Sequence, residues 1–188
     1  MFAEHGHHGT GMAQLGAAVG LQRGGLYHRI GNKEALLFEI GASQLRVMVE
    51  IALDIEKRVE DPEERFREPA RTLMEDIADH VLERTVHYRD FTALTGPLME
   101  SVLDLRKQCG QVWPRTLDAA IDAGHFRPMP ESVALKGILG MFNHSYVWLK
   151  KDAGLLPREI ADLFRDTFLT GTLRSAPRKD RTPRRPGL

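Results

Sequence analysis

Hydrophobic residues recur along this chain at the three- and four-residue spacing of amphipathic helices, and no run alternates hydrophobic and polar residues as a half-buried strand does. The first two helical segments are short. One spans residues 10–19, with Thr10 as its expected N-cap. The next spans residues 22–30, where Leu26 and Ile30 lie one turn apart on the inward face. The pattern predicts an all-α fold that opens with two short helices.

Longer helices are expected after this pair. One covers residues 33–58 with Asn32 before it as a cap, and Asp61, followed by a proline, marks the start of another over residues 62–85. Later helices are expected at residues 89–95, 98–123, 131–150 and 157–173. Pro114 should kink or restart its helix, because proline removes a backbone donor and clashes with the preceding turn.

Composition and charge narrow the picture. The chain has 188 residues, 42% hydrophobic and 28% charged, which is typical of a globular protein with a sizeable core. The net charge is zero, but residues 174–188 carry six basic residues against one acidic residue and almost no hydrophobic ones, so this tail is expected to be disordered. Residues 1–40 are neutral, which leaves the middle acidic. Any contact with DNA must therefore be made locally by few residues.

Other classes of protein find little support in the sequence. The chain has one cysteine, Cys109, no hydrophobic run near the ~18 residues that span a bilayer and no recognisable secretion signal, so we expect a cytoplasmic protein away from membranes. Paired carboxylates, a metal-ligand cluster and a nucleophile with a base are not evident, so we expect neither an enzyme nor a cofactor. His5, His7 and His8 are expected in a solvated loop rather than at a metal.

Two short helices joined by a glycine-containing turn, ahead of long helices, are typical of a helix-turn-helix. The second helix of such a motif presents small and polar side chains to the major groove of DNA. Glycines permit close approach, while basic, tyrosine and histidine side chains can reach phosphates or base edges. The candidate DNA-binding residues are Thr10, Gln22, Arg23, Gly24, Gly25, Tyr27, His28, Arg29 and Lys33.

Residues 1–45 resemble a known family. The segments that carry the likeness are Phe2-Ala3-Glu4-His5-Gly6, Gly9-Thr10-x-Met12, Ala17-Ala18-Val19-Gly20, Gly24-x-Leu26-Tyr27-His28 and Asn32-Lys33-Glu34-Ala35-Leu36. In this order and spacing they are similar to the DNA-binding domain of TetR/AcrR regulators. The family's first helix normally begins further upstream, and residues 1–5 correspond only to its end, so this helix is expected to be truncated. Either the native start lies upstream of Met1 or DNA binding is impaired.

The resemblance implies a domain organisation and a mechanism. Residues 1–40 would form the helix-turn-helix domain and residues 41–173 a helical ligand-binding and dimerisation domain, with residues 174–188 as the tail. A homodimer of this kind binds a near-palindromic, double-stranded operator and responds to a small effector. The segments Gly124–Pro128 and Met141–Asn143, followed by Trp148, are similar to a branch that responds to acyl-CoA or other lipid metabolites. The implied function is a ligand-responsive repressor with an apolar effector.

Two sets of residues are candidates for the later helices. An apolar pocket with a few polar groups is expected from Met74, Ile77, Phe91, Leu94, Met99, Trp113, Phe142, His144 and Trp148. A dimer seam of four helices is expected from Val133, Gly137, Gly140, Met141, Ile160, Leu163, Phe164 and Phe168. Plain core packing is the alternative for each pocket residue, and packing within one chain is the alternative for the seam.

A second reading of the function stays open beside the repressor. A dimeric helical ligand-binding or scaffold protein with a degenerate DNA-binding head would also carry a truncated first helix and a neutral N-terminal region. Sequence-selective binding to DNA separates the two readings.

Overall fold

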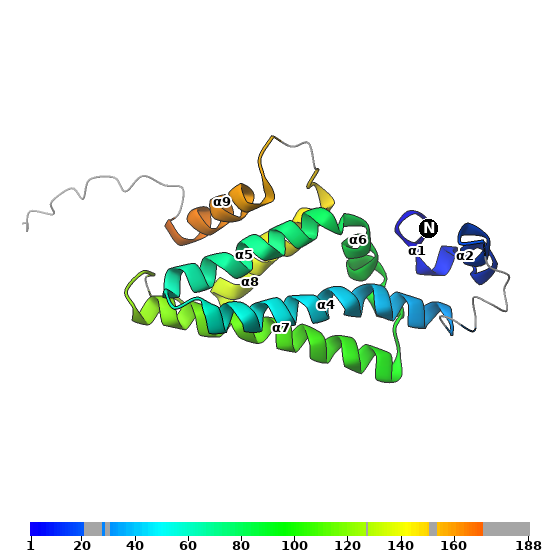
Figure 1. The fold of residues 1–188 in the computed structure, drawn as a ribbon, viewed down its shortest axis with the longest axis horizontal. Coiled ribbons are helices and arrows are strands. Elements are labelled where there is room, and N and C mark those ends of the chain that lie inside the picture. Colours follow the sequence, from blue (N-terminus) through cyan, green and yellow to red (C-terminus); the bar gives the residue numbers. More distant parts are fainter. Residues whose placement is uncertain (21–27, 29–30, 127, 151–153, 171–188) are drawn as a thin grey trace, which may run out of the picture.

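The structure is a computed structural model that describes residues 1–20, 28, 31–126, 128–150 and 154–170. Within these ranges the chain forms helices and no strand, which confirms the all-α fold. Figure 1 shows an elongated molecule in which two short helices lie at one end and the longer helices form a bundle. None of the described helices is both long and apolar enough to cross a lipid bilayer.

The short helices are α1 (Phe2–Gly9) and α2 (Met12–Ala18). Gly6 interrupts α1 with φ +75°, a conformation that glycine adopts without strain. The prediction that Thr10 caps α2 is wrong: Gly11 occupies the cap, and the buried Thr10 hydroxyl donates to the carbonyl oxygen of Gly6 at 2.8 Å. The expected helix over residues 22–30 lies outside the described residues except for residue 28, which is helical and exposed.

Helix α4 (Lys33–Arg58) has the predicted bounds and the predicted cap, since Asn32 Oδ1 accepts a hydrogen bond from the Ala35 backbone N–H at 2.7 Å. Its 26 residues correspond to a length of about 39 Å at 1.5 Å per residue. The helix passes without a break through residues 40 and 41, where the sequence suggested a domain boundary. The boundary itself stays a prediction.

Helix α5 (Pro62–Asp79) also starts as predicted, with Asp61 Oδ2 accepting from the Glu64 backbone N–H at 2.8 Å. The expected continuation to residue 85 is wrong, because the chain leaves the helical conformation at His80 and a separate helix, α6 (Val81–Asp90), begins there. The break places Arg84 against Asp76 of α5, where the two side chains form a buried ion pair. This tertiary contact replaces the continuous helix.

The remaining elements follow the predicted order with shifted ends. They are η1 (Phe91–Ala93), α7 (Gly96–Asp122), α8 (Glu131–His144), η2 (Ser145–Val147) and α9 (Pro157–Thr170). The expected restart at Pro114 is absent, because buried neighbours such as Trp113 and Leu117 keep α7 packed on both sides of the proline. Helix α8 ends at His144, short of the expected residue 150. The chain continues there as the 3-10 helix η2, and Ser145 Oγ donates to the carbonyl oxygen of Phe142 at 2.7 Å.

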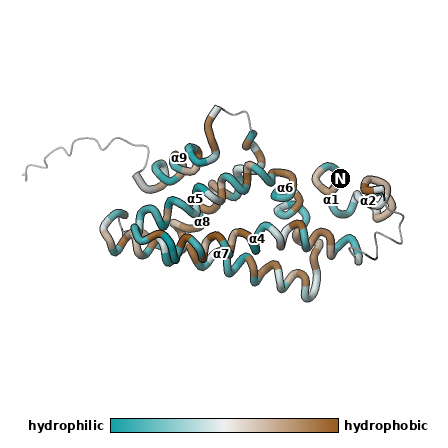
Figure 2. The backbone as a smooth tube through the Cα atoms, in the orientation of Figure 1, coloured by the Kyte–Doolittle hydropathy of each residue, from teal (hydrophilic) through white to brown (hydrophobic). Residues whose placement is uncertain are grey.

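Two hydrophobic clusters hold the molecule together. The larger joins α5, α7, α8 and α9 around Phe66, whose ring meets those of Trp113 and Phe126 edge to face at 5.8 and 5.3 Å. The smaller joins α1, α4, α6 and α7 and includes Phe2, Leu37 and Val86. Figure 2 shows hydrophobic and hydrophilic positions alternating along α4, α5 and α7, as in amphipathic helices. The second cluster attaches the N-terminal end to the bundle.

Helices α4 and α6 cross at Gly41, and this contact yields a prediction. A Cβ atom at Gly41 would lie 2.5 Å from Nδ1 of the buried His87 ring. We expect Gly41→Ala to lower the free energy of unfolding by about 1–3 kcal/mol, because overpacking outweighs the gain in helix propensity. Gly110→Ala on α7 is the matched control, since its Cβ would meet nothing within 4 Å. Urea unfolding compares the two, and equal stability of both variants would contradict the tight crossing.

Candidate functional site

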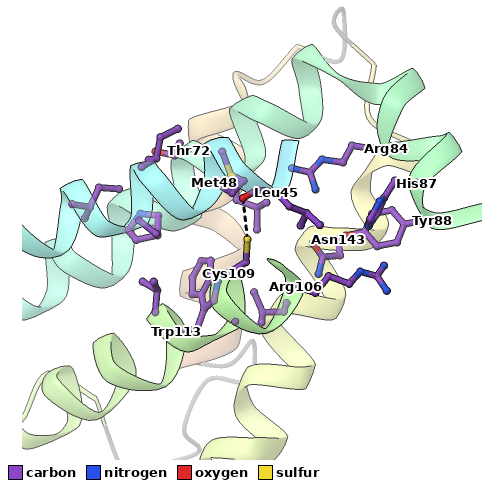
Figure 3. Close-up of a pocket in the computed structure, with 18 residues that line it drawn as sticks. Leu45, Met48, Thr72, Arg84, His87, Tyr88, Arg106, Cys109, Trp113 and Asn143 are labelled. Carbon is purple, nitrogen blue, oxygen red and sulfur yellow. Dashed lines mark hydrogen bonds between the residues drawn. The ribbon is translucent and has the colours of Figure 1, made fainter. Parts of the chain in front are cut away.

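A cavity of about 270 Å³ lies inside the bundle, between α4, α5, α6, α7 and α8. Its hydrophobic wall comes mainly from α4 and α7, through residues such as Leu45, Met48, Val112 and Trp113. Figure 3 shows polar side chains of α6 toward one end of the cavity and Trp113 toward the other. The polar residues of the lining are Thr72, Arg84, His87, Tyr88, Arg106, Cys109 and Asn143. A concave, mainly hydrophobic space with a few polar groups is the usual form of a small-molecule site.

The polar end is built by one face of α6. Arg84 is buried and donates to Asp76 Oδ2, with its Nε at 3.1 Å from that oxygen. Burial, together with the nearby charges of Arg106 and Arg84, lowers the pKa of His87 from 6.5 to about 4, so the imidazole is neutral at pH 7. Burial also raises the pKa of Tyr88 above its ordinary value. This end therefore combines guanidinium groups with neutral hydrogen-bonding groups.

The thiol of Cys109 lies on the cavity wall and is hydrogen-bonded. Its Sγ lies 3.3 Å from the carbonyl oxygen of Leu45 and donates to it. Burial raises the pKa of the thiol to about 11, so the reactive thiolate is scarce at neutral pH. The thiol is one more polar atom on the cavity wall.

The structure brings one of the nine predicted pocket residues, Trp113, to the cavity wall. Met74, Ile77 and Phe142 are buried in the larger hydrophobic cluster instead. The other predicted members lie elsewhere: Phe91, Leu94 and Met99 in the smaller cluster, and His144 and Trp148 at the exposed surface. The residues missed by the sequence reasoning are those of α4 and α6. For α6 the sequence did contain a signal: Arg84 is followed by His87 and Tyr88 three and four residues on, which places the three side chains on one helix face.

Helix α6 also holds the N-terminal end. Arg89 Nη1 donates to the carbonyl oxygen of Ala3 at 2.9 Å, and its Nη2 donates to that of Phe2. Asp90 Oδ2 accepts from the backbone N–H of His7 at 3.1 Å. The expected solvated loop at His5, His7 and His8 is wrong, because all three lie in α1; His5 and His8 are exposed, whereas the His7 ring is buried, with its centre 5.7 Å from that of the Phe2 ring. One short helix thus contacts both the cavity and α1.

The candidate DNA-binding residues are placed only in part. Thr10 is buried and its hydroxyl is engaged within the turn, Lys33 is half-buried at the first position of α4, and His28 is exposed. The remaining candidates, Gln22, Arg23, Gly24, Gly25, Tyr27 and Arg29, lie outside the described residues. Their contacts with DNA stay predictions.

The candidate dimer residues divide into exposed and packed ones. The exposed members are Val133, Gly137, Gly140 and Leu163, the half-buried ones are Met141, Phe164 and Phe168, and Ile160 is buried within the chain. A Cβ at Gly137 would lie 3.0 Å from the Phe168 ring, so this glycine allows α8 and α9 to pack within one chain. Gly140 faces open space. The exposed members are the ones that a second chain can reach.

A head of short helices attached to a bundle of long helices is the architecture of a class of helical DNA-binding regulators. Residues 1–40 match the family model "Bacterial regulatory proteins, tetR family", and residues 59–172 match "Tetracyclin repressor-like, C-terminal domain". The chain belongs to the TetR family of transcriptional regulators, which confirms the resemblance seen in its first residues. This family consists of regulators rather than enzymes.

Individual relatives agree with this assignment. The repressor KstR2 of Mycobacterium tuberculosis is 27% identical over 129 residues, which cover 68% of this chain and 64% of KstR2, less than two thirds of its length. PfmR of Thermus thermophilus has a solved structure with a TM-score of 0.85 and 25% identity, covering 92% of this chain and 94% of PfmR. AibR, solved with isovaleryl coenzyme A and operator DNA, has a TM-score of 0.78 and 27% identity, covering 92% and 93%.

Proposed function

We propose that this protein is a ligand-responsive transcriptional repressor that binds a near-palindromic operator as a homodimer in the cytoplasm and releases it when a small apolar effector enters the cavity. The observation that carries the proposal is that α6 both lines the cavity and binds α1. Arg84, His87 and Tyr88 line the cavity, while Arg89 and Asp90, one turn on, hold α1. A ligand that prefers one position of α6 therefore favours one position of the head.

The surface of α8 and α9, the helical head and the cavity would each contact a different partner: a second subunit, operator DNA and the effector. Two subunits paired through the exposed part of the α8 and α9 surface, which includes Val133, Gly140 and Leu163, would present two heads to successive major grooves about 34–36 Å apart. The hydrophobic wall around Trp113 suits an apolar effector. The AibR structure, which holds isovaleryl coenzyme A and operator DNA, supports an acyl-CoA or similar lipid-like compound. Contacts with DNA would come from the candidate residues at 22–29 and from Lys33.

Selection of bound DNA from a random pool, followed by gel-shift titrations at several salt concentrations, tests the DNA-binding part. We expect Tyr27→Phe and Lys33→Ala to weaken operator binding roughly tenfold, because each removes a phosphate contact, and Lys33→Ala to reduce the salt slope by about one. Lys107 is an exposed residue of α7, so Lys107→Ala is the matched control and should bind the operator as tightly as the unaltered protein does. Circular dichroism checks that all variants are folded.

Two outcomes would count against the proposal. Unchanged affinity in both Tyr27→Phe and Lys33→Ala would remove their phosphate role. Failure of the pool to yield any preferred sequence would remove the repressor itself, and would favour a helical ligand-binding or scaffold protein with a degenerate head.

A further inference from the structure

The charges around the cavity are unbalanced. Among the residues that the structure describes, two arginines, Arg84 and Arg106, belong to its lining, and no aspartate or glutamate does. The charge of Arg84 is neutralised by Asp76, which is not part of the lining and whose buried carboxylate forms an ion pair with the guanidinium. Arg106 is thus the source of the uncompensated charge.

Arg106 lies on α7 and is held by aromatic rings. Its guanidinium carbon lies 4.2 Å from the centre of the Phe91 ring and 5.9 Å from that of Tyr88. Within the described part of the chain no carboxylate forms an ion pair with this half-buried side chain. Aromatic faces attract a cation and fix its position, but they carry no net charge that could neutralise it. A partly desolvated guanidinium with only such partners gains most from an anion.

The rest of the cavity is shaped for a hydrophobic body. Met48, Ile55, Val112 and Trp113 belong to its hydrophobic lining, and Figure 3 places Trp113 toward the end opposite the side chains of α6. The volume of about 270 Å³ equals that of roughly nine water molecules in the liquid. The space therefore fits a short hydrophobic chain with one polar end.

We propose that the cavity binds a small amphiphile whose hydrophobic body lies against Trp113 and whose anionic group pairs with Arg106. The anion can be the carboxylate of a free short-chain acid, or a phosphate of a coenzyme A thioester that lies along the cavity with its pantetheine arm between the acyl group and Arg106. This inference rests on the proposed function only in taking the cavity as the effector site. It adds the charge of the effector and the residue that recognises it.

A set of matched six-carbon probes separates charge from hydrophobic contact. The chain has two tryptophans, so a Trp148→Phe background leaves Trp113, which lines the cavity, as the fluorescent reporter. We expect hexanoate to bind at least tenfold more tightly than 1-hexanol. If the anion is a phosphate, hexanoyl coenzyme A instead binds at least tenfold more tightly than hexanoyl pantetheine, which keeps the thioester and lacks the phosphates. Equal affinity within both pairs would overturn the proposal.

Substitution of Arg106 tests whether this side chain causes the preference for an anion. Arg106→Met keeps a long hydrophobic side chain and should lower the affinity for the preferred anion at least tenfold while leaving that for 1-hexanol unchanged. Arg106→Lys keeps the charge and should recover part of the loss. The neighbouring, exposed Lys107→Met is the matched control and should bind every probe as the parent does. An equal loss for anion and alcohol in Arg106→Met, or no recovery in a folded Arg106→Lys, would assign Arg106 a purely structural role and overturn the proposal.

The binding measurements contain no DNA, so the inference and the proposed function can fail separately. Selective binding of the anion without release of a bound operator would keep the inference and reject the effector mechanism. Release of the operator by 1-hexanol with no preference for either anion would keep the mechanism and reject the inference.

Discussion

Replacement of Asp76 with alanine is expected to lower the free energy of unfolding by about 3–5 kcal/mol. Asp76 and Arg84 are 8% and 4% exposed, so the substitution leaves a guanidinium charge buried without its partner. It also removes the oxygen that lies 3.1 Å from His80 Nδ1, at the break between α5 and α6. Urea unfolding followed by circular dichroism measures the loss.

The control for Asp76→Ala is Asp54→Ala, which breaks the exposed pair with Arg58 at 3.2 Å on α4. Exposed pairs of this kind contribute less than about 1 kcal/mol, because water screens the charges. The double variant Asp76→Ala with Arg84→Met should regain much of the stability, since it removes the unpaired charge as well. Similar small losses in Asp76→Ala and Asp54→Ala would show that the buried pair does not hold α6 in place.

Acidification is expected to destabilise the protein through His87. The pKa of His87 is lowered to about 4 in the folded chain, against 6.5 ordinarily, by burial and by the charges of Arg106 and Arg84. The unfolded chain therefore binds a proton that the folded chain rejects, and stability present above pH 6.5 is lost as the pH falls toward 4. At about 1.4 kcal/mol for each unit between the two pKa values, the expected loss is about 2 kcal/mol by pH 5 and about 3 kcal/mol by pH 4.

Urea unfolding at several pH values, with NMR titration of the imidazole proton, checks this dependence. His87→Gln should remove most of the fall in stability between pH 7 and pH 5, whereas the exposed His144→Gln should retain it. A slope in His87→Gln equal to that of the unaltered chain would assign the acid sensitivity to other groups.

Local signals in the sequence predicted the helix starts well. Asn32 and Asp61 accept hydrogen bonds from the backbone three residues on, an interaction that depends on neighbours in the chain alone. The break at His80 had no such signal, since the contact that accompanies it joins Asp76 of α5 to Arg84 of α6 across the turn. Because the sequence predicted one helix over residues 62–85, it did not indicate that α6 is a separate helix that contacts both the cavity and α1.

The cavity shows where sequence reasoning stops. Hydrophobic side chains such as Met74 and Phe142 have the composition of a pocket wall, yet they are fully buried in the core, and Trp113 alone of that set reaches the cavity. Five helices surround this space, and their relative rotation is set by packing that no single stretch of sequence records. The family, by contrast, was evident from residues 1–45, because the spacing of a helix-turn-helix is local.

The unbroken course of α4 bears on how this protein can be recombined with its relatives. A cut at residue 40 would fall in mid-helix, between Leu37 and Leu45, which are both buried in the cluster that also contains Phe2. A chimera joined near Val59, where the helix has ended, keeps α4 whole. It also carries the part of the cavity wall that α4 supplies, such as Leu45 and Met48, so exchanging the ligand-binding bundle changes a cavity that this helix helps to form.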